Sequence, residues 1–506
     1  MDSRAKAIKY NMITGWIYEL FALISGLILP RLILTTFGSD ANGLTSSISQ
    51  YLSFSVLLRA GLGGVTRAAL YKPLANKDFK TVSAIMAATR SYMRKVAFII
   101  LGYIGIIAIA YPLIVKSEYS WEFMFTMVLI IGSSVFVENF WGIQAKILLQ
   151  ADQKYHIQTI ASLASYVAAF GISVLFIKLG FSLMAVKIGA AATTCISPIF
   201  LNFYVKKRYK LDKTVLPDNS YIKQRWDAFA HQMATVLNDN VPIISMSFFV
   251  NLKEISVYTV YKTIVANMKK LIEAFVTGVN SLFGDMLAKK EYDTLKQTFN
   301  FVEWGFFAVC TVLYSVTAIM LVPFVRIYTD SVNDVNYIRP IFALLITAVA
   351  FMRCVRMPYQ MLTEAAGHFK PTRNGAILEV IINVCASVSL MFFLGITGIL
   401  LGGLISATIR TLQYAIYAFR HILKIPLIRL LRSFGVYFSM FGLSITLIEF
   451  YTFPDDLNYL TWAIYSTVVL LVVLVLVVTV SFITNRKELI KFVRKFFKKF
   501  KKGIAS

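Results

Sequence analysis

The chain has 506 residues, of which 58% are hydrophobic and only 15% are charged, and its mean hydropathy is +0.68. Charged residues in this proportion are too few to cover the surface of a soluble protein of this size, which excludes a soluble globular fold. The formal net charge of +25 would suit nucleic-acid binding, but the basic residues lie beside long apolar segments, as membrane topology signals do. The composition therefore predicts a polytopic helical membrane protein with no nucleic-acid partner.

The first apolar segment follows a basic N-terminus and could be mistaken for a signal peptide. It is too long for the apolar region of a signal peptide, and no small-residue cleavage site ends it. We therefore interpret it as the first of fourteen spanning helices, each long enough to cross about 30 Å of hydrocarbon. The predicted spans are residues 8–37, 42–71, 80–115, 121–150, 155–178, 181–205, 226–250, 255–284, 294–324, 337–363, 372–394, 397–420, 430–451 and 459–483.

The orientation of these spans follows from the loops. Lysine and arginine concentrate in alternate connections, which the positive-inside rule assigns to the cytoplasm. Both termini and the connector 206–225 are then cytoplasmic. The basic C-terminal segment has an apolar helical face, which predicts an amphipathic helix on the anionic lipids of the inner leaflet. That face consists of Leu489, Val493, Phe496 and Phe500.

The chain repeats itself at offsets of 212 to 214 residues. LANKDFKTV at 74–82 recurs as LAKKEYDTL at 287–295, ILLQADQKY at 147–155 pairs with MLTEAAGHF at 361–369, and Pro30 pairs with Pro242. The repeat predicts an all-α fold with two parallel six-helix lobes and two appended helices; transporters with such repeats hold the substrate between lobes. The predicted parts are the N-terminal lobe 1–205, the cytoplasmic linker 206–225, the C-terminal lobe 226–423, the added helices 424–484 and the tail 485–506.

Several basic residues lie inside the predicted spans, where a cation costs at least about 2.5–3.5 kcal/mol. In a regular second helix, Arg59, Gly63 and Arg67 would lie along one stripe, with Arg59 near mid-depth. Lys269 and Lys270 hold nearly the place of Arg59 in the second repeat. We predict a cationic cleft between the lobes, formed by Arg31, Arg59, Arg67, Lys262, Lys269, Lys270, Arg353, Arg356 and Arg410.

These cations outnumber the acids counted as partners for them, which are Glu19, Glu138, Asp239, Glu273 and Glu303. Some pairing is expected, but the surplus needs an anionic partner or water. Because a guanidinium binds a diphosphate through two parallel hydrogen bonds, we predict a phosphate-bearing substrate.

Asp239 precedes Pro242 in the sequence NDNVP and is the candidate for coupling to Na⁺ or H⁺, together with Asn383 and Glu138. A helix-packing carboxylate paired with lysine is the alternative for Asp239. No other cofactor is expected. The cysteines occur in no metal-binding or disulfide pattern, and we expect free thiols in helix packing. They are Cys195, Cys310, Cys354 and Cys385.

GLILPRLILTTFGSDANGL followed by LLRAGLGGVTRAAL resembles the opening of the bacterial polysaccharide transporter family. This family comprises the O-antigen and capsule flippases of the multidrug/oligosaccharidyl-lipid/polysaccharide exporter superfamily. The resemblance implies two lobes in a V that flip undecaprenyl-diphosphate-linked oligosaccharide from the inner to the outer leaflet of the bacterial cytoplasmic membrane, for surface polysaccharide synthesis.

The same resemblance implies that helices 13 and 14 form a groove for the prenyl tail. By similarity to lipid II flippases, it also implies cavity cations at Arg31, Arg59 and Lys269 or Lys270. Lysine replaces arginine on helix 8, which weakens the argument for bidentate phosphate contact there. Polysaccharide polymerase machinery is a candidate partner.

Two other functions compete with this one. A multidrug/cation antiporter of the same superfamily would be expected to have twelve helices and an acidic cavity. A membrane-embedded polysaccharide polymerase or ligase would need a large outer loop with catalytic groups, whereas the predicted outer loops are short and the histidines do not cluster. We therefore predict a flippase and not an enzyme.

Overall fold

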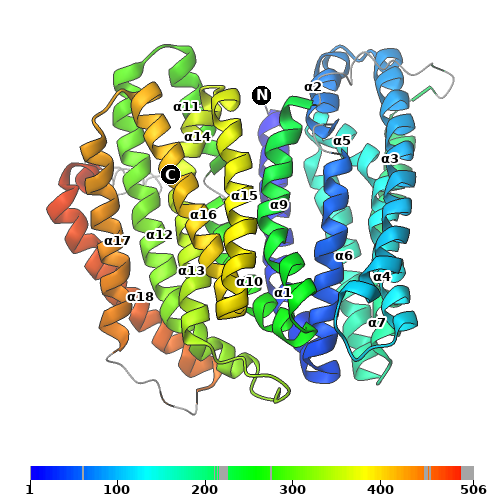
Figure 1. Cartoon of the computed structure of the whole chain (residues 1–506). Helices are drawn as coiled ribbons and strands as arrows, with labels where there is room; N and C mark the ends of the chain where they lie inside the picture. Colours follow the sequence, from blue (N-terminus) through cyan, green and yellow to red (C-terminus); the bar gives the residue numbers. More distant parts are fainter. Residues whose placement is uncertain are drawn as a thin grey trace. The chain divides into compact units, whose positions relative to one another are not determined.

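The computed structural model describes residues 2–59, 62–209, 211–212, 215, 226–273, 276–449, 454 and 457–491. In this part of the chain the regular elements are helices and no strand is present (Figure 1). Ten of the described helical segments are long and apolar enough to cross a membrane, and each predicted span overlaps a described helix. The predicted all-α polytopic fold is confirmed, and its helices are consistent with fourteen passages.

Two predicted features fall largely outside the described residues. The tail helix is described only as far as Lys491, so Val493, Phe496 and Phe500 lie beyond it. Most of the connector 206–225 is likewise outside the described residues. The orientation of the helices in the membrane stays a prediction.

Packing divides the chain into two compact units, with a boundary inside helix α10 (Leu252–Glu273). Unit 1 comprises Met1–Thr259 and Ser331–Val335, and unit 2 comprises Val260–Asp330 and Asn336–Ser506. The seventh predicted span therefore packs with unit 1, although the sequence repeat places it at the start of the second lobe. The division into lobes by repeat stays a prediction.

Two glycines shape the helices of unit 1: Gly38 bends a helix, and Gly43 brings two backbones close together. Gly38 has φ of +84° inside α1, and the helix that continues after it is capped by Asp334, whose Oδ2 accepts from the Ser39 N–H at 2.8 Å. A Cβ on Gly43 would lie 2.0 Å from the Leu252 carbonyl oxygen. The helices of unit 1 are α1 (Asp2–Ser53), α2 (Leu62–Ala75), α3 (Phe79–Ile114), α4 (Trp121–Val137), α5 (Ile143–Ala151), α6 (Tyr155–Lys178), α7 (Leu183–Thr193), α8 (Ile196–Arg208) and α9 (Trp226–Phe249).

Unit 2 has an aromatic core around one buried carboxyl group. Glu303 on α12 accepts a hydrogen bond from the Tyr359 hydroxyl at 2.5 Å, and the ring of Tyr359 packs near those of Phe299, Phe307 and Phe434. Beyond the end of α10, the helices of unit 2 are α11 (Val276–Ala288), α12 (Tyr292–Tyr328), α13 (Pro340–Val355), α14 (Met357–Ala365), α15 (Phe369–Leu394), α16 (Ile396–Tyr417), α17 (Leu427–Glu449) and α18 (Tyr459–Thr484).

The predicted repeat is visible in the turns between helices. Lys77 and Lys290 occupy equivalent turns, where the Lys77 N–H donates to the Leu74 carbonyl at 3.2 Å and the Lys290 N–H to the Leu287 carbonyl at 3.1 Å. Few residues other than glycine adopt the left-handed conformation of these positions, so its recurrence at matching sites argues against chance similarity. Two further pairs share a positive φ at similar offsets, Gln153 with Gly367 and Gly180 with Gly395.

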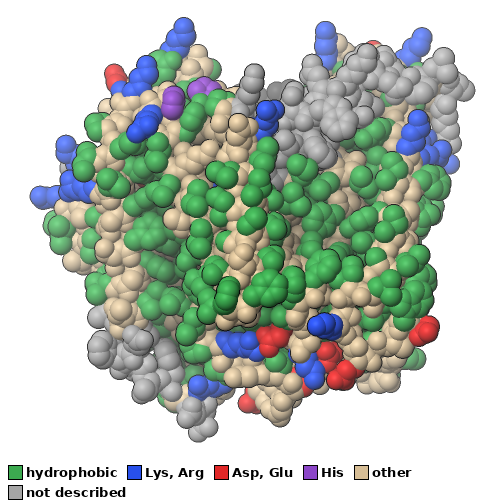
Figure 2. Space-filling view, in the orientation of Figure 1, with side chains coloured by type: hydrophobic (Ala, Val, Ile, Leu, Met, Phe, Trp, Pro, Cys, Tyr) green, Lys and Arg blue, Asp and Glu red, His purple; other side chains and the backbone are tan. Residues whose placement is uncertain are grey.

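The outer surface of the helices is apolar along most of their length. On the face shown in Figure 2, hydrophobic side chains cover the middle of the helices and charged side chains gather toward their ends. Helix α18 has a mean hydropathy of 3.0 over its most apolar window, yet only 17% of that window is buried. Such a helix is stable only against lipid, which accounts for the exposed apolar surface.

Helices α15 and α16 approach closely through a pair of glycines four residues apart. A Cβ on Gly398 would lie 2.2 Å from the Leu390 carbonyl oxygen, and one on Gly402 would lie 2.3 Å from the Ser387 backbone nitrogen. Small residues at this spacing let helix backbones meet in a membrane. A Cβ on the adjacent Gly403 would meet no atom of a neighbouring helix nearer than 3.9 Å.

We expect Gly402→Ala to destabilise the protein by about 1–3 kcal/mol, because the two backbones must separate. Gly403→Ala is the matched control: both changes gain the same helix propensity, and only Gly402→Ala meets backbone atoms. Thermal unfolding of the purified protein in detergent measures both. Equal melting temperatures for the two variants would contradict the close approach.

Candidate functional site

Arg59 ends a 3₁₀-helical segment within the second predicted span. Residues Phe54–Arg59 form a 3₁₀ helix, residues 60 and 61 are outside the described part, and α2 begins at Leu62. The single stripe of Arg59, Gly63 and Arg67 assumes a regular α-helix, whereas residues 54–59 are 3₁₀-helical. Since residues 60 and 61 lie outside the described part, the stripe stays a prediction.

Arg59 has no acidic partner among the residues that the structure describes. Its side chain is half-buried and makes no hydrogen bond or ion pair within that part of the chain. The acid whose charge acts on Arg59 is Glu138, but Glu138 is bound by Lys146 at 2.7 Å. Glu138, one of the proposed coupling residues, begins the π-helical turn Glu138–Gly142 and already has a lysine as its partner.

Arg67 is held by neutral groups. Its Nη1 donates to Gln150 Oε1 at 2.7 Å, and the Gln150 amide donates to Gln158 Oε1 at 2.8 Å. Arg90 on α3 likewise donates to an amide, Gln144 Oε1, at 3.3 Å. Amides orient a guanidinium without neutralising it, so these contacts leave the charges of Arg67 and Arg90 uncompensated.

The remaining predicted residues of unit 1 lie on α1 and α9. Arg31 is half-buried on α1, and Asp239 is half-buried on α9 between the buried residues Asn238 and Asn240. Asn240 Oδ1 accepts from the Ser53 hydroxyl at 2.9 Å, which ties α9 to the end of α1. The role of Asp239 in ion coupling stays a prediction.

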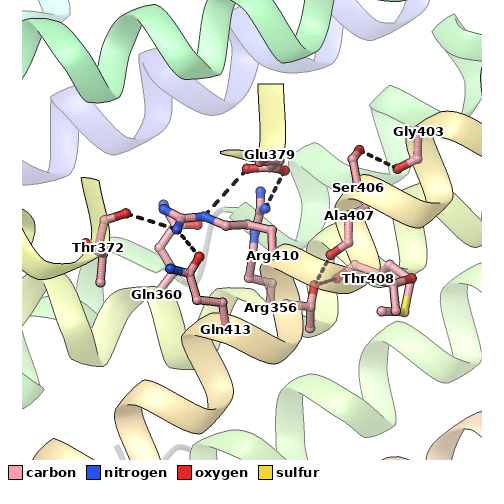
Figure 3. Close-up of polar contacts among 12 residues, drawn as sticks. Arg356, Gln360, Thr372, Glu379, Gly403, Ser406, Ala407, Thr408, Arg410 and Gln413 are labelled. Carbon is pink, nitrogen blue, oxygen red and sulfur yellow. Dashed lines mark hydrogen bonds and ion pairs between the residues drawn. The ribbon is translucent and has the colours of Figure 1, made fainter. Parts of the chain in front are cut away.

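Unit 2 has a buried ionic cluster around Glu379 on α15 (Figure 3). Arg356, between α13 and α14, donates to Glu379 Oε1 at 2.8 Å, and Arg410 Nε on α16 lies 3.6 Å from Glu379 Oε2. Arg410 also donates to the Thr372 carbonyl at 3.0 Å and to Gln413 Oε1 at 2.6 Å. The side chains of Arg410 and Glu379 are only 3% and 7% exposed, so the cluster lies inside the helix packing.

The cluster changes the interpretation of two predicted cleft residues. Arg356 and Arg410 share one carboxylate of the same unit, Glu379, which offsets one of their two positive charges and weakens the argument that they bind an anionic substrate. Glu379 is absent from the acids counted as possible partners in the sequence. A lone acid inside the apolar segment 372–394 was the signal that could have identified it.

The other candidates in unit 2 differ in their surroundings. Lys269 pairs with Glu273 at 3.0 Å, and Asn383 is fully buried, with its Oδ1 accepting from the Ser387 hydroxyl at 3.2 Å. Asn383 lies where α15 packs on α16, since a Cβ on Gly403 would be 3.9 Å from its Oδ1. Lys262 and Lys270 lie on α10, and Arg353 lies near the end of α13. In the described residues, no group of three or more histidine, cysteine, aspartate or glutamate side chains could hold a metal ion.

No protein-family model and no curated protein sequence matches the chain. Solved structures do match it. The lipid II flippase MurJ in an inward closed conformation superimposes with a TM-score of 0.70 at 13% sequence identity, over 93% of this chain and 98% of MurJ.

Two transporters of the MOP superfamily are also similar. An inward-facing multidrug resistance MATE family transporter has a TM-score of 0.61 at 13% identity, over 81% of this chain and 97% of its own. A Pyrococcus furiosus transporter, described as having a binding pocket of reversed polarity, has a TM-score of 0.56 at 14% identity, over 83% and 95%. The chain thus has the fold of MOP-superfamily transporters, as its sequence predicts.

Proposed function

We propose that the protein is a flippase that moves undecaprenyl-diphosphate-linked oligosaccharide from the inner to the outer leaflet of the bacterial cytoplasmic membrane. The observation that supports this most is that Arg59 and Arg67 form no ion pair with an acid among the residues that the structure describes. Arg59 ends a 3₁₀-helical segment of a predicted spanning helix, and Arg67 is held by a neutral amide. Irregular helical segments line substrate sites in many transporters.

The chemistry of a diphosphate suits these groups. Burying an isolated charge in hydrocarbon costs tens of kcal/mol before relaxation, whereas a guanidinium offers two parallel hydrogen bonds to phosphate oxygens. In addition to Arg59 and Arg67, the proposed cleft includes Arg31, Lys262, Lys269, Lys270 and Arg353. We propose that Arg356 and Arg410 shape the cleft but do not contact the diphosphate, since Glu379 binds both. Alternating access moves the headgroup while the prenyl chain stays in lipid.

A multidrug/cation antiporter is the second candidate, because MATE transporters share this fold. A cationic drug would be repelled by Arg59 and Arg67, which favours the flippase. Coupling of either activity to Na⁺ or H⁺ through Asp239 is part of the proposal, with Asn383 and Glu138 as weaker candidates in view of their partners. A role in surface polysaccharide synthesis would place the protein beside a polymerase.

Flipping by the purified protein in lipid vesicles distinguishes the two candidates. We expect transport of undecaprenyl-diphosphate-linked oligosaccharide at a rate well above that of protein-free vesicles, and no accumulation of a cationic dye in any Na⁺ or H⁺ gradient. Accumulation of the dye without flipping of the lipid would instead establish the antiporter.

A further inference from the structure

A polar cavity of about 570 Å³ lies in unit 2 at the end where α12 begins, α17 begins and α18 ends. The positive-inside rule predicts that this end faces the cytoplasm. The cavity is formed by unit 2 alone, and none of the predicted cleft residues lines it. It is therefore separate from the residues proposed to carry the substrate.

The cavity is strongly cationic. Arg429 and Arg432 line it from α17, Lys487 and Lys491 line it from the segment after α18, and Glu488 is the one acid among the lining residues. Within the described part of the chain these four cations form no ion pair and no side-chain hydrogen bond; Lys491 lies 5.8 Å from the centre of the Phe301 ring. Basic pockets between membrane helices on the cytoplasmic side bind phosphate-bearing lipid headgroups.

A second feature of the cavity is an amide that needs a hydrogen-bond donor. Asn300 on α12 lines the cavity, and its Oδ1 is buried without a hydrogen-bond partner in the described residues. A buried acceptor left unpaired costs about 1–3 kcal/mol. A bare phosphate offers this oxygen no donor when fully ionised, whereas a hydroxyl group beside the phosphate does.

The rim of the cavity suits a lipid. Ile428 and Leu431, next to the two lining arginines, are 72% and 64% exposed. Phe482 and Ile483, just before the lining residue Thr484, are 51% and 74% exposed. In Figure 2, basic side chains lie beside hydrophobic ones over the end of α18. A headgroup in the cavity would thus have apolar surface beside it for its acyl chains.

We propose that this cavity binds the headgroup of an anionic phospholipid that carries hydroxyl groups beside its phosphate, as phosphatidylglycerol does. Arg429, Arg432, Lys487 and Lys491 bind the phosphate, and a headgroup hydroxyl donates to Asn300. The acyl chains lie along the exposed apolar residues of α17 and α18. The lipid joins α12, α17 and α18 at one end of unit 2, and this role does not depend on the proposed transport function.

Lipid binding to the purified full-length protein, followed by native mass spectrometry, tests the proposal. We expect phosphatidylglycerol to bind at least about tenfold more tightly than phosphatidylcholine with the same chains, and Arg429→Gln with Arg432→Gln to weaken it by about tenfold or more. The charge of Arg429 acts on the buried Glu303, so a second pair from the segment after α18, Lys487→Gln with Lys491→Gln, guards against a folding defect. It should weaken binding similarly.

Two exposed arginines outside the cavity provide the matched control. Arg373→Gln with Arg420→Gln removes the same charge and should change the affinity less than about twofold. Asn300→Ala should weaken phosphatidylglycerol but leave phosphatidic acid, which has no headgroup hydroxyl beyond its phosphate, nearly unchanged.

Three results would overturn the assignment. The first is unchanged phosphatidylglycerol affinity in both double variants of the cavity. The second is complete displacement of the lipid by millimolar inorganic phosphate, which would identify a site for the free ion. The third is displacement by undecaprenyl diphosphate at lower concentrations than by phosphatidylglycerol, which would identify a site for transported lipid.

Discussion

Replacing Arg59 by alanine should reduce export of lipid-linked oligosaccharide severely while leaving the amount of folded protein in the membrane unchanged. The side chain makes no hydrogen bond or ion pair to the described part of the chain, so its loss breaks no such contact. It would remove the charge and the planar group that we propose to contact the diphosphate. Surface polysaccharide and folded protein should be measured in the same cells.

Two further variants separate charge from geometry and position. Arg59→Lys should restore export only in part, because an ammonium keeps the charge without the bidentate fork. Arg94→Ala, at an exposed position of α3, is the matched control and should export normally. If Arg59→Ala lowers folded protein and export together, and removing Glu138 restores both, Arg59 is instead a structural partner of that acid.

Replacing Glu379 by alanine should lower the free energy of unfolding by about 3–5 kcal/mol, because it leaves buried cations without their carboxylate. Arg356 and Arg410 are the groups left unpaired, with side chains only 16% and 3% exposed. Export should fall in proportion to the loss of folded protein. Thermal unfolding in detergent, compared with export per folded molecule, measures this.

A second substitution and a control decide the cause of this loss. Adding Arg410→Gln to Glu379→Gln should recover part of the stability, since one unpaired cation is then removed. Glu364→Gln is the matched control: Glu364 accepts a hydrogen bond from Gln360 at 2.7 Å and should matter by less than about 1 kcal/mol. If Glu379→Ala unfolds like the wild type but fails to export, the cluster acts in transport and its structural assignment is wrong.

The sequence predicted the features that depend on long apolar segments and on local turns. Each predicted span overlaps a helix, and the charged loop repeated at offset 213 is matched by the left-handed turns of Lys77 and Lys290. Both features follow from local physics: a spanning helix must satisfy its own backbone hydrogen bonds, and a tight turn needs specific φ angles.

What the sequence could not predict depends on contacts between helices. Glu379 is 23 residues from Arg356 and 31 from Arg410 along the chain, and only the packing of α15 against its neighbours brings them together. The 3₁₀ segment of residues 54–59 was also missed, because the position rule for helices assumes a regular α-helix. The cavity of Arg429 and Lys487 arises from three helix ends and has no local sequence pattern.

Flipping of a fluorescent undecaprenyl-diphosphate-linked oligosaccharide in vesicles tests the central claim most directly. Vesicles with the wild-type protein, vesicles with Arg59→Ala and protein-free vesicles are compared by adding a membrane-impermeant quencher and following the fraction of labelled lipid that becomes accessible. We predict rapid and complete accessibility with the wild type, and a slow rate with Arg59→Ala close to that of protein-free vesicles. Equal rates for wild-type and protein-free vesicles, or for wild type and Arg59→Ala, would contradict the claim that Arg59, with the other proposed cleft cations, carries a diphosphate across the membrane.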